Sequence, residues 1–207
     1  MLSKTYWNNY LALGLNFEWD DWYYLNFINK IIPRKCKDLN WKLFHGVLNT
    51  ENRLKRMKYS NGICKSCHTE AENAEHLLIR CQYRQRIWNL IGNIINDLYP
   101  QINFNMTKTN IMAGFFNKEQ EDRALIINLL LSMGRYHLWI TRNAIKYDNI
   151  SSTFIGAANR LKYYFLSHIK ILLTSKLTNV GIKEDLGRLQ NIIERKIHNR
   201  IRETDFG

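Results

Sequence analysis

The spacing of apolar residues along the chain predicts a mostly α-helical protein. Apolar positions recur every three or four residues, as on one face of a helix, in four long segments: 83–99, about 118–147, about 152–177 and 184–202. A further helical pattern begins at Asp38, and Thr50 can cap a short helix that reaches Leu54. The sequence shows neither the alternation typical of strands nor an internal repeat.

The first 37 residues are rich in aromatic side chains. We expect them to form a helical segment that packs on the core, because aromatic residues at this density are more often core than base-stacking surface. Asp20 and Asp21 favour the start of this helix, and Pro33 is expected to end it. Its apolar stripe consists of Trp19, Trp22, Tyr23 and Phe27.

The helices after residue 100 have recognisable ends. Residues 100–118 form a polar, Asn-rich connection, and Ser152 or Thr153 can cap the helix that follows. The long helix between them has an acidic start and a basic end, which suits its dipole. These charges are Glu119, Glu121 and Asp122 at the start, and Arg135, Arg142 and Lys146 toward the end.

Three of the four cysteines and one histidine form a C-x2-C-x8-H-x4-C array: Cys64, Cys67, His76 and Cys81. Three thiolates and one imidazole fill all four positions of a tetrahedral zinc ion, which is typical of a structural site. Residues five apart on a helix are about 140° out of register, so we expect a helix to begin or end beside the metal. The array therefore predicts one structural Zn²⁺ in a short CCHC loop inserted between helices.

The array leaves two alternatives open. His68 adjoins Cys67 and could replace His76 as the fourth ligand, although His76 lies in an apolar helical phrase that fixes its direction. Cys64 and Cys67 could instead be a redox pair, but a thioredoxin-like site needs a βαβ context that the sequence lacks. Cys36 has no partner nearby and is expected to be an ordinary buried thiol.

The loop that carries the array is acidic rather than basic. Glu70, Glu72 and Glu75 outnumber Lys65 and Arg80, and we interpret these carboxylates as a solvated loop. We therefore expect the metal unit to stabilise the neighbouring helices rather than to bind phosphate itself. The sequence patterns divide the chain into three predicted parts. These are an aromatic N-terminal segment 1–37, a CCHC zinc-binding domain 38–99 and a C-terminal helical region 100–207.

Composition and charge narrow the classes of function. The chain has 207 residues, 45% of them hydrophobic, and only two prolines, so it is long and apolar enough to fold around a core. Its net charge of +12 and pI near 9.6 predict attraction to a polyanion. No run of about 18 apolar residues occurs, and residues 1–15 lack the pattern of a signal peptide. We expect no membrane partner and a reducing, intracellular compartment.

Lysine and arginine are concentrated in two segments that we predict to contact nucleic acid. One lies directly before the zinc loop, where a phosphate-facing surface is at least as plausible as a merely solvated one, and the other ends the last helix. The predicted contacts are Arg34, Lys35, Lys37, Lys42, Arg53, Lys55, Arg56 and Lys58 in the first segment, and Arg195, Lys196, Arg200 and Arg202 in the second.

The residues around the array resemble a known family. The phrase Trp41-Lys42-Leu43-Phe44-His45-Gly46-Val47-Leu48-Asn49-Thr50-Glu51-Asn52-Arg53-Leu54 precedes Cys64-x2-Cys67, Glu72-x2-Glu75-His76-Leu77-Leu78, Cys81 and Trp88. This order resembles the zinc-binding domain downstream of the reverse transcriptase in LINE-type, non-LTR retrotransposon polyproteins. The resemblance is specific over about 38–90. It is weaker from Trp19 to Asn143, where Leu138-Trp139-Ile140-Thr141-Arg142-Asn143 is similar to a recurrent phrase, and residues 1–15 and 150–207 carry no matching motif.

The resemblance implies a ligand set and a function. It places the zinc ligands on Cys64, Cys67, His76 and Cys81, and it implies that the domain binds RNA and helps the polymerase engage the element's transcript during target-primed reverse transcription. The implied partners are RNA, with DNA as an alternative, and the upstream reverse transcriptase domain of the same polyprotein. The implied location is a cytoplasmic ribonucleoprotein and the nucleus.

The sequence departs from a whole polyprotein in what it lacks. It has no Tyr/Phe-x-Asp-Asp polymerase motif, because Asp20-Asp21 follows Trp19 without the required residue, and nothing resembles the endonuclease. We therefore expect a non-catalytic fragment or domain. A nuclease would need clustered carboxylates for two metal ions, and no Gly-rich phosphate loop or HExxH helix occurs. The main alternative function is a zinc-stabilised module that docks onto the polymerase or another protein.

Overall fold

The computed structural model describes residues 20, 23–148, 150 and 153–204, and of residues 118 and 197–204 it describes the backbone alone. Within these residues the chain forms helices joined by loops, with one isolated bridge between Ile63 and Ala71 and no strand. The prediction of a mostly α-helical domain with a CCHC loop between helices is confirmed. The main helices are α3 (Arg34–Phe44), α4 (Glu51–Arg56), α5 (Gln82–Leu98), α6 (Lys108–Met112), α7 (Glu121–Tyr147), α8 (Phe154–Thr174) and α9 (Val180–Thr204).

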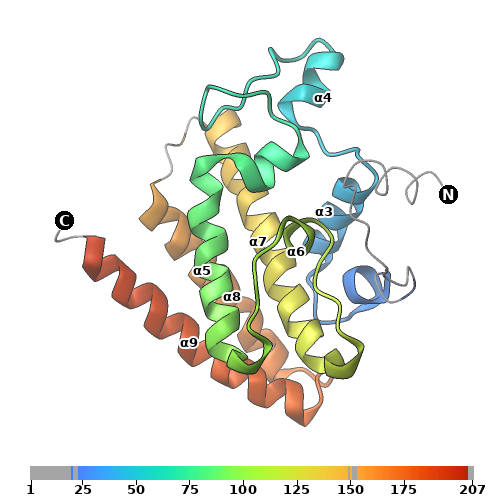
Figure 1. Ribbon diagram of the computed structural model, residues 1–207, viewed down its shortest axis with the longest axis vertical. Coiled ribbons are helices and arrows are strands. Elements are labelled where there is room, and N and C mark those ends of the chain that lie inside the picture. The colour runs from blue at the N-terminus through green and yellow to red at the C-terminus, as the bar shows by residue number, and fades with distance from the viewer. Residues whose placement is uncertain (1–19, 21–22, 149, 151–152, 205–207) are drawn as a thin grey trace.

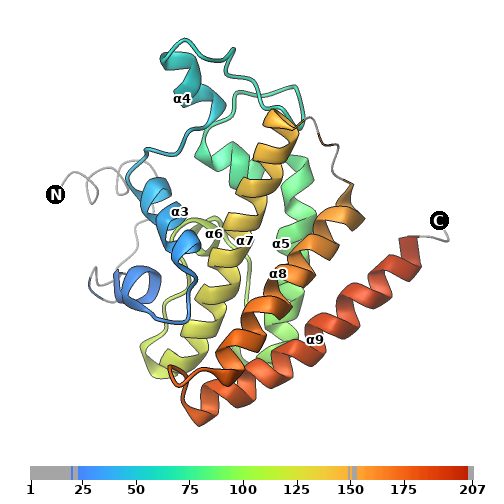
Figure 2. The same cartoon turned by 180° about the vertical axis from the view of Figure 1, so that it is seen from behind.

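Short helical turns join these helices. Two π turns, η1 (Tyr24–Ile28) and η2 (His76–Arg80), precede α3 and α5, and two 3-10 turns, η3 (Pro100–Ile102) and η4 (Lys118–Gln120), flank α6. Figure 1 shows α4 and the zinc loop together at one end of the long helices α5 and α7, with the turn between α8 and α9 at the other end. Seen from behind in Figure 2, α8 and α9 form a helical hairpin, and α9 extends along the edge of the molecule.

The N-terminal segment differs from its prediction in one respect. The helical turn ends at Ile28, before Pro33, and Pro33 instead occupies the N-cap position of α3. Proline is well suited to a helix start, because its fixed φ and missing N–H cost nothing there. Trp19 and Trp22 of the predicted stripe lie outside the described residues, while Tyr23 is exposed and Phe27 packs against the core.

Helices α5 and α7 pack closely at the centre of the molecule. A Cβ atom on Gly134 of α7 would lie 2.6 Å from Ile91 Cδ1 and 2.9 Å from Trp88 Cζ3 of α5, so only glycine allows this approach. Both partners are buried, and one core of buried side chains runs from Leu25 to Ile193. No helix in the described part of the chain has the length and apolarity needed to cross a membrane.

The guanidinium of Arg135 joins three preceding elements to α7. It is buried and donates from Nε to Asn40 Oδ1 at 2.9 Å in α3, from Nη1 to the Ile111 carbonyl at 2.9 Å in α6, and from Nη2 to Asn26 Oδ1 at 3.4 Å in η1. Burial lowers the pKa of Arg135 to about 10. Arg135 lies in the middle of α7 rather than at the basic end expected from the sequence, whereas Arg142 lies near that end, and both side chains are buried.

Candidate metal centre

The zinc loop begins as a tight hairpin. The Cys64 N–H donates to the Glu70 carbonyl and the Glu72 N–H donates to the Gly62 carbonyl, both at 2.9 Å, across the Ile63–Ala71 bridge. Gly62 has a φ of +88°, and a Cβ there would lie 2.7 Å from Lys55 Cδ of α4. The hairpin therefore needs glycine at this position, both for its backbone angle and because the stem of Lys55 covers it.

The hairpin and the start of α5 bring the four predicted ligands together. One ligand atom each from Cys64, Cys67, His76 and Cys81 lies within 4.8 Å of the other three. With Zn–S bonds of about 2.3 Å, a tetrahedral site places its sulfur atoms about 3.8 Å apart, so the cluster fits a zinc ion. Cys64, His76 and Cys81 are buried and Cys67 is half-buried, which leaves little room for a reacting molecule.

A π turn explains how His76 and Cys81 reach the same metal. The Cys81 N–H donates to the His76 carbonyl at 3.0 Å, an i→i+5 bond that brings residues five apart back toward one side. Cys81 is then extended and serves as the N-cap residue of α5. The expectation that a helix begins or ends at the metal is confirmed, since η2 ends and α5 begins at this cysteine.

Further hydrogen bonds orient the ligands. His76 Nε2 faces Cys67 Sγ at 3.4 Å, while Nδ1 lies 3.2 Å from Glu70 Oε2, so the carboxylate fixes which ring nitrogen faces the metal. The Thr69 hydroxyl donates to Cys67 Sγ at 3.2 Å. Hydrogen bonds from Cys81 and from backbone N–H groups, including that of Ser66 at 3.4 Å, lower the pKa of Cys64 well below its usual value. At Cys64 these bonds favour the thiolate form that zinc requires.

The structure separates the two candidate histidines. His68 is exposed, has a left-handed φ of +58° and lines a groove beside the loop. It does not belong to the cluster of four ligand atoms, whereas His76 does. Cys36 is buried away from the cluster and its sulfur lies 3.4 Å from the Tyr164 hydroxyl, and burial raises the pKa of its thiol to about 11.

A buried ion cluster anchors the zinc loop to α7, and the sequence analysis missed it. The Glu72 carboxylate, interpreted as solvated, is fully buried and receives Arg142 Nη2 at 2.6 Å and Nε at 3.0 Å. It also accepts the Glu51 N–H at 3.0 Å, so it caps the start of α4. The solvated interpretation of Glu72 is wrong, because its side chain is the point where the zinc hairpin, α4 and α7 meet.

Glu51 completes this cluster on the other side of Arg142. Its Oε1 accepts Arg142 Nη2 at 2.6 Å and Lys146 Nζ at 2.5 Å, and its Oε2 accepts the Ser60 hydroxyl. Burial opposes the charge of Glu51, but bonds from Lys146 and Ser60 and the charge of Arg142 lower its pKa overall. Two carboxylates and two cations balance one another. The one sequence feature that could have pointed to this cluster was Arg142, which lies in the recurrent phrase 138–143.

The first predicted nucleic-acid segment is only partly free. Lys55, Arg56 and Lys58 are exposed on and after α4, and Arg34 is exposed at the start of α3. The others have partners or are half-buried. Lys35 lies over the Tyr164 ring at 4.2 Å, Lys42 pairs with Asp38 at 2.7 Å, Arg53 donates to the Gly46 carbonyl at 3.4 Å, and burial lowers the pKa of Lys37.

The described side chains of the second predicted nucleic-acid segment make ion pairs within the protein. Lys196 Nζ lies 2.9 Å and Arg195 Nη2 3.7 Å from Asp97 Oδ2, so both cations face the same carboxylate of α5. The side chains of Arg200 and Arg202 lie outside the described residues, although their backbone continues α9. Contact of these residues with nucleic acid stays a prediction, and α4 is its more accessible site.

Comparison with known proteins agrees with the geometry. Residues 3–88 match the family described as zinc-binding in reverse transcriptase, so the match begins well before the segment 38–90 that carries the clearest motifs. Over 132 residues the chain is 26% identical to the "Transposon TX1 uncharacterized 149 kDa protein" of Xenopus laevis. This alignment covers 63% of the chain but 9% of that protein, so the chain spans a small part of its relative. No solved structure matches the chain.

The family match and the Cys3His cluster together confirm the prediction of one structural zinc ion. The matched family is defined by metal binding rather than by catalysis, and the cluster uses all four tetrahedral positions. Residues 3–88 of the chain are therefore similar to the zinc-binding domain of a retrotransposon reverse transcriptase, and the Cys3His cluster lies within that match.

Proposed function

We propose that the chain is a non-catalytic RNA-binding domain that helps a retrotransposon reverse transcriptase engage the element's RNA during target-primed reverse transcription. The parent protein would be an RNA-directed DNA polymerase, with its reverse transcriptase domain upstream. It would work in a cytoplasmic ribonucleoprotein and in the nucleus. DNA is the alternative nucleic acid, since phosphate contacts alone do not distinguish the two.

The observation that carries this proposal is the charge of the domain. A net charge of +12 accompanies a metal site that is itself closed, so the excess cations lie outside the zinc cluster. Arg56 and Lys58 are exposed where α4 leads into the zinc loop, at one end of the molecule (Figure 1). Lysine and arginine that neutralise phosphates release counterions, and this release favours binding at low salt.

Reversal of exposed charges tests the proposal. We expect Arg56→Glu with Lys58→Glu to weaken binding of a labelled RNA oligonucleotide by about tenfold at low salt, because each lost phosphate contact removes counterion release. Arg53 and Lys55 are left unchanged, since one donates to Gly46 and the other covers Gly62.

Fluorescence anisotropy at several salt concentrations measures the effect. The matched control is Lys170→Glu with Lys176→Glu, two exposed lysines at the end of α8 and just after it. If the unaltered protein binds no RNA at physiological salt, the proposed function is wrong. If both double variants bind equally well, the assignment of α4 is wrong.

A protein-docking role is the second candidate, and exposed apolar side chains favour it. Trp41 is 47% exposed on α3, and Met57 and Tyr59 are 50% and 76% exposed after α4. Such residues at one end of the domain suit contact with a polymerase. A protein that fails to bind RNA alone but binds the separately purified reverse transcriptase domain would support docking instead.

A further inference from the structure

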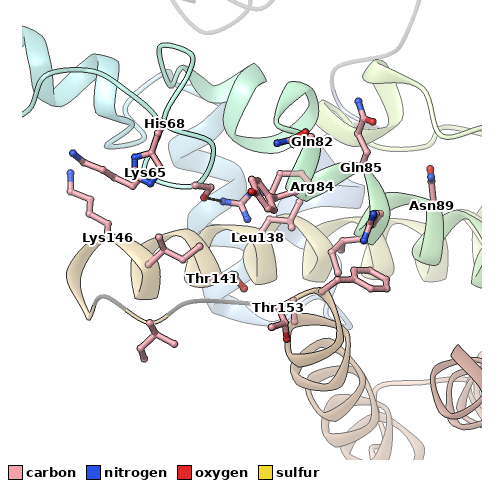
Figure 3. A pocket seen from close by; sticks show the side chains of 18 residues that line it. Lys65, His68, Gln82, Arg84, Gln85, Asn89, Leu138, Thr141, Lys146 and Thr153 are labelled. Carbon is pink, nitrogen blue, oxygen red and sulfur yellow. Dashed lines mark hydrogen bonds between the residues drawn. The ribbon is translucent and has the colours of Figure 1, made fainter. Parts of the chain in front are cut away.

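A groove lies beside the zinc loop, and residues next to three of the metal ligands line it. It has a volume of about 1100 Å³ and is lined by the zinc loop, the start of α5, the end of α7 and the start of α8. Figure 3 shows Lys65 and His68 of the loop at one end, Gln82, Gln85 and Asn89 along α5, and Thr153 at the start of α8. None of the sequence-predicted nucleic-acid contacts lines it.

The charged side chains that line this groove are all cationic. Its described lining residues include Lys65, Arg84, Arg86 and Lys146 and no carboxylate. Lys146 is held by Glu51, and Arg84 donates to the Ser66 hydroxyl at 2.7 Å. Lys65 and Arg86 make no ion pair with any described residue, so their charges are available to an anion.

A stripe of amide side chains runs beside these cations on α5. Gln82, Gln85 and Asn89 are exposed and follow one another at intervals of three and four residues, with Arg86 beside them. This spacing places them on one helical face. Amide and guanidinium groups offer donors to phosphate oxygens as well as donors and acceptors to base edges.

Two buried polar atoms at the groove lack a partner among the described residues. They are Arg84 Nε and Thr141 Oγ1, and both residues line the groove while being less than 5% exposed. A buried donor without a partner is unfavourable unless a bound molecule or water satisfies it. The wall of the groove therefore holds two polar atoms without a partner among the described residues, although neither atom is itself exposed to the groove.

Aromatic rings accompany the cations. Tyr83 is 53% exposed at the start of α5, and the Phe154 ring of α8 lies 5.9 Å from the guanidinium carbon of Arg86. Both residues line the groove. Of the two rings only Tyr83 is exposed, and an exposed aromatic face next to cations can stack on an unpaired base while the cations hold the phosphates. An acidic peptide would use the cations but not the ring faces.

We propose that this groove, rather than α4 alone, binds the backbone of a single-stranded nucleic acid, with Lys65 and Arg86 on its phosphates and the amide stripe of α5 on its bases. The inference rests on the proposed function and adds a second, separate surface to it. The zinc ion then has an indirect role, because the loop it folds carries Lys65 at one end of the groove.

Charge reversal in the groove tests this inference. We expect Lys65→Glu with Arg86→Glu to weaken single-stranded RNA binding by at least about tenfold. The slope of log K against log salt should fall by about 1.4, since each single-strand phosphate contact contributes about 0.7. Lys170→Glu with Lys176→Glu is again the control; it makes the same change in net charge about 24 Å along α8 from Phe154. Arg86→Glu alone keeps the zinc loop unaltered, and zinc content and circular dichroism report folding.

Each outcome separates this inference from the proposed function. Loss of binding in the folded groove variants, with the control unchanged, supports the groove. Competition by single-stranded but not duplex oligonucleotides supports the single-strand assignment, and equal competition by an acidic peptide overturns it. If the unaltered protein binds RNA and the folded groove variants bind as tightly as the control, the groove is wrong and the proposed function stands. If the unaltered protein binds no RNA, both are wrong.

Discussion

At the residue scale, two histidines eight positions apart have opposite roles although both lie between Cys67 and Cys81 of the array. His76 is buried in the π turn before Cys81, with its Nδ1 held by Glu70 and its Nε2 facing Cys67. His68 occupies the exposed, left-handed end of the tight turn that begins at Cys64. Spacing alone allows either ligand, and the backbone path decides between them.

This difference predicts opposite outcomes for the same substitution. We expect His76→Asn to lose zinc and most of the fold, because structural zinc contributes its binding free energy directly to folding. His68→Asn should keep one zinc per chain and a melting temperature within about 2 °C of the unaltered protein, since asparagine tolerates a positive φ. Metal analysis and thermal unfolding measure both. Zinc retained by His76→Asn and lost from His68→Asn would reverse the assignment.

At the scale of elements, the sequence predicted the long helices well and the buried charges poorly. Helices α5, α7, α8 and α9 lie within a few residues of their predicted ranges, and Thr50 and Thr153 cap α4 and α8 as expected. Periodicity finds such helices because each has one apolar face against a common core.

The zinc ligands were found because a metal restricts both residue type and spacing. Glu72 and Arg142 lie 70 positions apart, and their pairing depends on how α7 passes the loop. Local pattern contains no information on that path. The groove was missed for the same reason, since its walls come from two distant stretches of the chain, 65–89 and 138–157.

Two glycines should respond oppositely to substitution by alanine: Gly134, where α5 and α7 approach closely, and Gly187 on α9. We expect Gly134→Ala to destabilise the protein by about 1–3 kcal/mol, because the methyl group would overlap Ile91 and Trp88. Gly187→Ala in α9 has no atom within 4 Å of the added methyl group and should stabilise by up to about 1 kcal/mol through helix propensity. Urea unfolding followed by circular dichroism measures both. Equal effects would show that the α5–α7 contact is looser than described.

At the scale of the whole molecule, the buried ion cluster connects the zinc loop with the long central helix. Arg142 is near the end of α7, whose other residues contact η1, α3, α5, α6 and the α8–α9 hairpin. Loss of a carboxylate that pairs with Arg142 should therefore destabilise this core as well as the zinc loop. The division into segments 1–37, 38–99 and 100–207 stays a prediction. The contacts of α7 lead us to expect that segments 38–99 and 100–207 unfold together.

We expect Glu72→Gln to lower the free energy of unfolding by about 3–5 kcal/mol, because it leaves buried Arg142 without one of its two carboxylates. Glu75→Gln is the matched control in the same loop. Its carboxylate pairs with Lys108 at 3.0 Å near the surface, and such pairs contribute about 0–1 kcal/mol. Calorimetry of the zinc-loaded protein should show one transition for both variants, shifted strongly only in Glu72→Gln. Two transitions, of which only one responds to Glu72→Gln, would mean instead that the zinc domain unfolds independently of residues 100–207.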